Sequence, residues 1–206
     1  GVSTLGITLL FTRKTPSGPS AGSAIDHLAF KVPDLGPFVD KLAKTPYKSF
    51  HPPASPPASH DKPMEDTLMV DGPDGVRIEL IEDNTMYASL EFNHIHLYST
   101  QSKDMQAWYL NNLGGRPGAA ENPDSLLLPG APLTFTQAAS VLPSADRAID
   151  HLSFEVKGLD ALCQNLTENG VKLDSAPHSV PELKASVAVL TDPWGTRIEL
   201  LEKAAR

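Results

Sequence analysis

Cysteine, long apolar runs and clusters of basic residues are all scarce in this chain. The one cysteine, Cys163, cannot form a disulfide within the chain, and its place among apolar helix positions predicts a small buried residue. This cysteine usage fits a reducing compartment, so we expect a cytoplasmic protein. No apolar run approaches the roughly 20 residues that a membrane-spanning helix needs, and no stretch reads as a targeting segment.

Positive charge is also in deficit. The formal net charge is −8 and the pI is near 5.3, and no patch of Lys and Arg offsets the acidic excess. Phosphate backbones and anionic lipids are repelled by such a surface, so we expect neither nucleic acid nor membrane partners. With 40% hydrophobic residues the chain can still bury a core. We therefore expect an ordinary soluble globular protein.

An internal repeat is the main positive signal. The segment AIDHLAFKV at 24–32 returns as AIDHLSFEV at 148–156, a shift of 124 residues. Downstream, GPDGVRIELIE at 72–82 matches DPWGTRIELLE at 192–202 with a shift of 120. The first copy therefore holds four extra residues, which we place in the proline- and serine-rich stretch 49–63, an exposed loop. Repeats of this length indicate a duplicated supersecondary unit.

Each unit reads as strand, helix, loop, strand, turn, strand. Apolar residues recur at helical spacing in 35–42, 105–113 and 159–166, and Gly- and Asp-containing turns precede the last strand of the repeated units. The units are 24–90, 91–147 and 148–206, preceded by a fragment at 1–23. By the 124-residue shift the counterpart of 91–124, about 34 residues, is missing in front of Gly1. We expect an N-terminal domain at 1–90 with a truncated first unit and a C-terminal domain at 91–206.

Strand parity places ionisable residues together on one face. In HLSFE, Leu152 faces the apolar side, so His151 points to the opposite, polar side. The same parity puts His94 and His96 opposite Ile95, and Glu199 opposite the apolar residues of its strand. Two histidines and one carboxylate hold a divalent ion while leaving positions open for substrate, which suits Lewis-acid catalysis.

Repeated βαβββ units with H-x-x-F in the first strand of alternate units and DP-x-G-x-x-IEL in the last resemble the vicinal oxygen chelate superfamily, which includes glyoxalases, bleomycin resistance proteins and extradiol dioxygenases. The resemblance covers essentially the whole chain. It implies an α+β fold in which tandem βαβββ modules pair into cupped, barrel-like mixed sheets with the helices outside, and a metal ion in the cup.

Carried over to this sequence, the resemblance implies metal ligands at His94, His151 and Glu199, with His96 as an alternative to His94. It also implies that His27 and Glu79 correspond to ligands of the N-terminal pair, whose first ligand would fall in the missing segment. His178, in the segment SAPHSVPE, which we expect to be a loop, is the candidate acid/base group. The metal would be Fe, Mn, Zn, Ni or Co, since all accept this ligand set.

Two subfamily signatures are absent. The fourth, acidic ligand of glyoxalase I-like members falls on Thr134, and SVAVL at 186–190 lacks the tyrosine of extradiol dioxygenases. What remains is a three-ligand lyase, isomerase or dioxygenase acting on a small oxygen-rich molecule by bidentate chelation or enolate stabilisation. The alternative is a metal-free ligand-sequestering protein of the bleomycin-resistance type. Because a missing first strand exposes a sheet edge, we also expect a homodimer.

Overall fold

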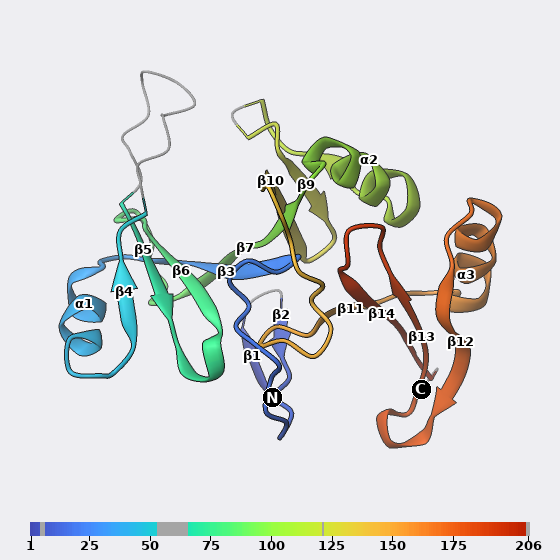
Figure 1. Ribbon diagram of the computed structural model, residues 1–206, viewed down its shortest axis with the longest axis horizontal. Helices are drawn as coiled ribbons and strands as arrows, with labels where there is room; N and C mark the ends of the chain where they lie inside the picture. The colour runs from blue at the N-terminus through green and yellow to red at the C-terminus, as the bar shows by residue number, and fades with distance from the viewer. Residues whose placement is uncertain (5–6, 53–65, 121, 205–206) are drawn as a thin grey trace.

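The computed structural model describes residues 1–4, 7–52, 66–120 and 122–204, and most of the proline-rich stretch 49–63 lies outside these residues (Figure 1). The first complete unit consists of β3 (Ile25–Val32), α1 (Gly36–Leu42), β4 (Lys48–Phe50), β5 (Thr67–Asp71) and β6 (Arg77–Glu82). The second consists of β7 (Glu91–Ser99), α2 (Ser102–Leu113), β8 (Arg116–Pro117), β9 (Ser125–Leu128) and β10 (Ala131–Gln137). The third consists of β11 (His151–Glu155), α3 (Leu159–Glu168), β12 (Leu173–Val180), β13 (Ala185–Thr191) and β14 (Arg197–Lys203). The expected α+β fold of tandem βαβββ units is confirmed.

The first two complete units share one eight-stranded sheet, in the order β4-β5-β6-β3-β7-β10-β9-β8. At its centre β3 and β7 pair antiparallel, and each is flanked on its other side by the parallel last strand of its own unit. This pairing joins unit 24–90 to unit 91–147, across the boundary expected at residue 90. The expectation from the sequence instead pairs unit 91–147 with unit 148–206.

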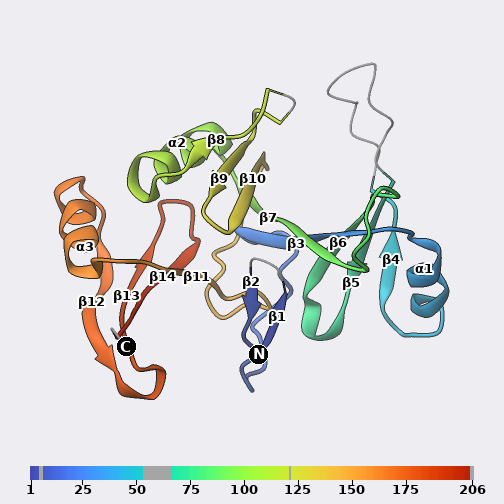
Figure 2. The ribbon, with the colours of Figure 1, turned by 180° about the vertical axis from the view of Figure 1, so that it is seen from behind.

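The third unit forms a separate four-stranded sheet, β11-β14-β13-β12. A short hairpin of β1 (Val2–Thr4) and β2 (Ile7–Leu9) makes a third, two-stranded sheet. In the front and back views the hairpin lies below β3, beside the loop that leads into β11 (Figures 1 and 2). Within the described residues β11 therefore has a strand on one side only.

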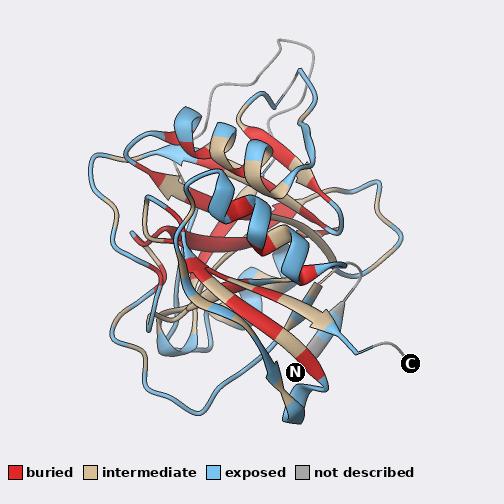
Figure 3. Cartoon of the chain, turned by 90° about the vertical axis from the view of Figure 1, so that its right-hand side faces the viewer, coloured by how far each residue is buried: buried red, intermediate tan, exposed pale blue. Residues whose placement is uncertain are grey.

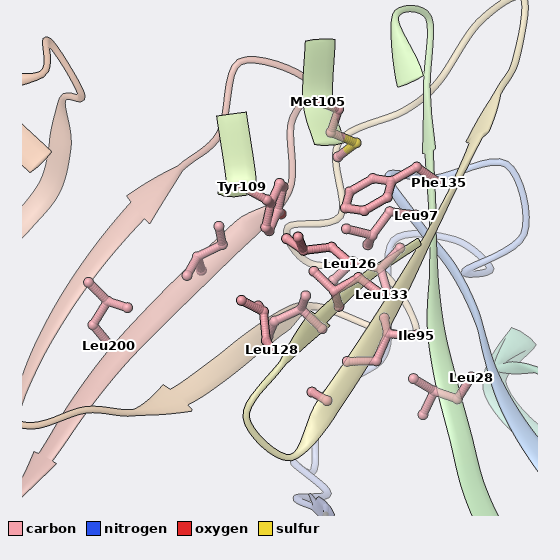
Figure 4. Packing of buried hydrophobic residues seen from close by; sticks show 14 of the residues in the cluster. Leu28, Ile95, Leu97, Met105, Tyr109, Leu126, Leu128, Leu133, Phe135 and Leu200 are labelled. Atoms are coloured by element: carbon pink, nitrogen blue, oxygen red, sulfur yellow. The ribbon is translucent and has the colours of Figure 1, made fainter. Parts of the chain in front are cut away.

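The helices cover the sheets from outside. The buried residues of α2 and α3 face the strands and their exposed residues face outward, a pattern visible in the burial colouring (Figure 3), whereas α1 has no buried residue. Around α2 the core is continuous: Met105 and Tyr109 pack with Leu97, Leu133 and Phe135 (Figure 4). Full burial of aliphatic and aromatic side chains contributes about 1.5–3 kcal/mol each. Cys163 is buried, as predicted.

The hydroxyl of Tyr109, which is fully buried, donates to the Asp192 carboxylate across 3.0 Å. Asp192 also accepts from the backbone N–H groups of Trp194 and Thr196, which closes the DPWG turn. A hydrogen bond to a charged group is worth about 1.5–3 kcal/mol. One buried carboxylate thus ties the second unit to the third.

No helix in the described ranges has both the length and the apolar character to span a membrane.

Candidate metal centre

Four side chains with metal-ligand chemistry converge at the centre of the eight-stranded sheet. His27, Glu79, His94 and His96 each offer a ligand atom, and these atoms all lie within 4.8 Å of one another. They come from β3, β6 and β7, the three central neighbouring strands of that sheet. The residues that the structure describes contain no other such group of three or more potential ligands.

The strand register brings these residues together. Ala29 of β3 lies opposite Glu79 of β6 on one side and opposite His94 of β7 on the other. His27 is two residues from Ala29 and so projects from the same face, where it lies opposite His96. The small Ala29 side chain lets the Glu79 and His94 side chains approach each other above it, to 3.7 Å between Glu79 Oε2 and His94 Nε2.

His27 is held in one orientation. Its Nδ1–H donates to the Asp26 carboxylate over 2.7 Å, and its side chain is only 2% exposed. Asp26 is itself held by the N–H of Gly22 at 2.7 Å and lies 3.9 Å from the Arg77 guanidinium. This arrangement fixes the tautomer, so that the lone pair of Nε2 points away from Asp26. His27 Nε2 is buried and has no hydrogen-bond partner.

The histidines of β7 form a short hydrogen-bonded chain. His94 Nδ1–H donates to Asn93 over 2.7 Å, which leaves its Nε2 as the acceptor of His96 Nδ1–H at 3.2 Å. The Thr136 hydroxyl in turn donates to His96 Nε2 over 2.8 Å. A metal at His94 Nε2 uses the same lone pair that accepts from His96, so binding there breaks the His94–His96 hydrogen bond.

The electrostatics of His94, His96 and Glu79 favour the protonation states that a cation needs, whereas those of His27 favour its protonated ring, whose proton a cation would have to displace. Burial lowers the pKa of His94 to about 4 and that of His96 well below its usual value, so both rings are neutral at pH 7. Burial alone would raise the pKa of Glu79, but its contact with His27 and the nearby His94 lower it, and Glu79 is ionised. Burial opposes charge on His27, yet Asp26 and Glu79 together raise its pKa. An ionised carboxylate beside neutral imidazoles is the set that binds divalent metal ions.

The donor spacing fits a common metal ion. Glu79 Oε2 lies 3.5 Å from His27 Nε2 and 3.7 Å from His94 Nε2. Ligands about 2.1 Å from a tetrahedral ion are separated by about 3.4 Å. An unpartnered buried nitrogen costs about 1–3 kcal/mol, a penalty that coordination of His27 Nε2 would remove. The residues present therefore fit a divalent cation.

The sequence-based candidates fall into two places. His94 lies in the central group, but His151 and Glu199 lie on β11 and β14 of the other sheet, and neither belongs to that group. His151 donates to Asp150 over 2.6 Å, and Glu199 accepts from Ser153 over 2.8 Å. His178 lies in strand β12 rather than in a loop, with its Nδ1 3.0 Å from the carbonyl of Ala176.

The resemblance implies His27 and Glu79 as ligands, but of a site whose first ligand is not expected among residues 91–147. The structure supplies His94 as their neighbour because β7 pairs with β3. The sequence carries no signal for this pairing, because units 24–90 and 148–206 are both complete and both adjoin unit 91–147. Asp26 is not among the sequence-based candidates, although the repeated aspartate directly before the histidine is a signal for the local hydrogen bond that orients His27.

Comparisons with known proteins agree with this fold. Glyoxalase I from Zea mays superposes with a TM-score of 0.64 at 15% identity, covering 88% of this chain and 68% of that chain. A mutant form of the same maize enzyme gives a TM-score of 0.63 at 15% identity, covering 88% and 69% of the two chains. At this identity the likeness shows the fold. No curated protein matches the chain in sequence. The profile of the Glyoxalase/Bleomycin resistance protein/Dioxygenase superfamily matches residues 91–200, more than half of the chain, and the protein belongs to that superfamily.

Proposed function

We propose that the protein is a metal-dependent enzyme that acts on a small oxygen-rich molecule, with the ion held by His27, Glu79 and His94. The observation that carries this proposal is the buried, unpartnered Nε2 of His27, which faces the ionised Glu79 carboxylate at 3.5 Å. A bound divalent ion would supply Lewis acidity, polarising substrate oxygens and stabilising an enolate or a bidentate chelate. Fe, Mn, Zn, Ni and Co all suit these ligands.

Other residues of the chain orient the ligand side chains or lie beside the ion. Asp26 orients the His27 ring and Asn93 orients the His94 ring, so that both Nε2 atoms are available to the same ion. His96 is within 3.2 Å of His94 and is held by Thr136, which places a second neutral imidazole beside the ion. His96 is thus either a fourth ligand or a group that contacts the substrate.

A metal-free sequestering protein is the second candidate, since the superfamily description includes bleomycin resistance proteins. The two candidates differ in one respect: sequestration needs no ligand set. An ionised carboxylate buried with three histidines costs desolvation free energy in a protein that does not use it. This cost favours the metal-dependent enzyme.

Calorimetric titration of the metal-free protein with Fe(II), Mn(II), Zn(II) and Ni(II) tests the proposal. We expect one-to-one binding that His27→Ala abolishes and that the matched control His151→Ala leaves unchanged. Loss of binding in His151→Ala with retention in His27→Ala would instead support the set His94, His151 and Glu199. Absence of binding in the parent chain would refute metal dependence and favour sequestration. Binding would justify a substrate screen among hydroxy- and keto-compounds.

A further inference from the structure

The hairpin β1–β2 repeats the hairpin β9–β10 in register. Val2 lies opposite Leu9 in the first, and Leu126 lies opposite Leu133 in the second, with a shift of 124 between the pairs. The environments differ. Leu133 is fully buried and pairs with Ile95 of β7, whereas the described residues place no strand beside β2 other than β1.

The residues that follow Leu9 and Leu133 show the same contrast. Phe135 is 2% exposed and lies with its ring centroid 5.6 Å from that of Tyr109 on α2, but its counterpart Phe11 is 72% exposed. Leu10, next to it, is 71% exposed. These side chains have the apolar character of a core position without the strand and helix that bury Phe135.

The edge of β11 that corresponds to the β7-paired edge of β3 has no partner among the described strands. β3 has β6 on one side and β7 on the other, whereas β11 has only β14 among the described strands. The consequence shows in exposure: His27 is 2% exposed, and the side chain of His151, its counterpart, is 33% exposed. Ala29 is fully buried, and its counterpart Ser153 is exposed.

The backbone hydrogen bonds next to β3 have counterparts next to β11. Ala24 N–H donates to the carbonyl of Leu142 at 2.8 Å, and Ala148 N–H donates to the carbonyl of Gly18 at 3.0 Å, a reciprocal pair in which each residue is exchanged for its counterpart 124 positions away. Beside the first of these bonds, Tyr98 N–H of β7 donates to the carbonyl of Ala24. The corresponding acceptor is the carbonyl of Ala148, which receives no backbone bond from the residues that the structure describes.

From these two matched edges we infer that β2 and β11 form one docking site for a strand–helix unit of the kind made by residues 91–113. β7 fills the equivalent position between β10 and β3, parallel to the first and antiparallel to the second. In that position Ile95 lies opposite both Leu133 and Leu28. The docked strand therefore runs parallel to β2 and antiparallel to β11, and one apolar residue of it lies opposite both Leu9 and Leu152.

The occupant has a defined chemistry. Its strand alternates apolar and polar side chains, and its helix carries an apolar stripe that covers Leu10 and Phe11, as α2 covers Phe135. On the polar face, the position equivalent to His94 lies opposite Ser153, beside Glu199 and His151. A histidine there completes a second set of two histidines and one carboxylate. This last step rests on the proposed metal function, whereas the docking itself does not.

The test adds such a unit to the full chain. A copy of residues 91–124 is fused in front of Gly1, and amide hydrogen exchange is compared with the parent chain. We expect the free-edge amides of β11 and β2 to exchange at least about tenfold more slowly in the fusion, because open edges exchange freely. The matched control carries aspartate in the added copy at the positions of Ile95 and Leu97, and it should exchange like the parent.

Unchanged exchange at both strands in the fusion would overturn the inference. So would a parent chain that sediments as a dimer with β11 already protected, because a second copy would then be the occupant. Metal stoichiometry distinguishes the docking of the added unit from metal binding at the second site. Protection together with a rise from one to two equivalents of bound metal, a rise that His151→Ala reverses, supports both the docking and the metal binding. Protection without a second equivalent supports the docking and refutes metal binding at that position.

Discussion

The modules that contain His27 and His151 have nearly the same local chemistry and different surroundings. In both, an aspartate precedes the histidine and bonds its Nδ1, and an arginine at the start of the last strand lies within 3.9 Å and 3.3 Å of that aspartate, respectively. Only the His27 module has, among the described strands, a neighbour that supplies further histidines. The comparison teaches that a repeated local pattern makes half a site, and that strand pairing completes it.

The largest difference between the modules should be in packing. Phe30→Ala should cost about 3–5 kcal/mol of unfolding free energy, because Phe30 is 7% exposed and packs edge to face on Phe92 at 5.8 Å. Phe154→Ala, its counterpart on the half-buried β11, should cost about 1–2 kcal/mol, since less apolar area is lost. Urea unfolding of the metal-free variants measures both. Equal losses would mean that the pairing of β3 with β7 adds nothing to the burial of Phe30.

Acid should destabilise the metal-free protein through His94. Its folded pKa of about 4 lies below the ordinary 6.5, so the unfolded chain binds more protons between these values. Stability therefore falls as the pH drops from 6.5 to 4, by an amount on the order of 3 kcal/mol from His94. The raised pKa of His27 acts in the opposite sense, contributing stability that is lost as the pH rises through its folded value. Urea midpoints against pH should show a flatter acid limb in His94→Gln than in the parent. An unchanged limb would contradict the burial of this ring.

Orientation of His27 should have a smaller effect, on metal affinity. Asp26→Asn should weaken binding by about 10–100-fold, because an amide holds the imidazole tautomer less firmly and lowers its basicity. The matched change Asp150→Asn should leave affinity at the central site unchanged, since Asp150 orients only His151. Titration with the same ion compares the two variants. Equal weakening would indicate that both aspartates act through general stability.

Much of the fold could be predicted from the sequence. The three βαβββ units, their helices and the polar strand face with His94 follow from repeat spacing and side-chain alternation, and all three units are present. The partner of β7 does not follow. β3 and β11 carry almost identical sequences, so no local property says which edge β7 covers.

The site could be predicted in part for the same reason. The sequence points to His94 as a ligand, but the identity of its companions depends on register across a sheet, where Ala29 lies between Glu79 and His94. Hydrogen bonds such as that between Asp26 and His27 involve neighbouring residues and are within reach of the repeat. The burial that lowers the pKa of His94 and His96 depends on tertiary packing and could not be inferred from the repeat.

The most direct test of the central claim is the position of the ion itself. Crystals of the chain grown with Zn(II) and measured at the zinc absorption edge should give an anomalous peak within about 2.1 Å of His27 Nε2 and His94 Nε2. A peak bonded to His151 or Glu199 instead, or no peak between His27, Glu79 and His94, would contradict the account.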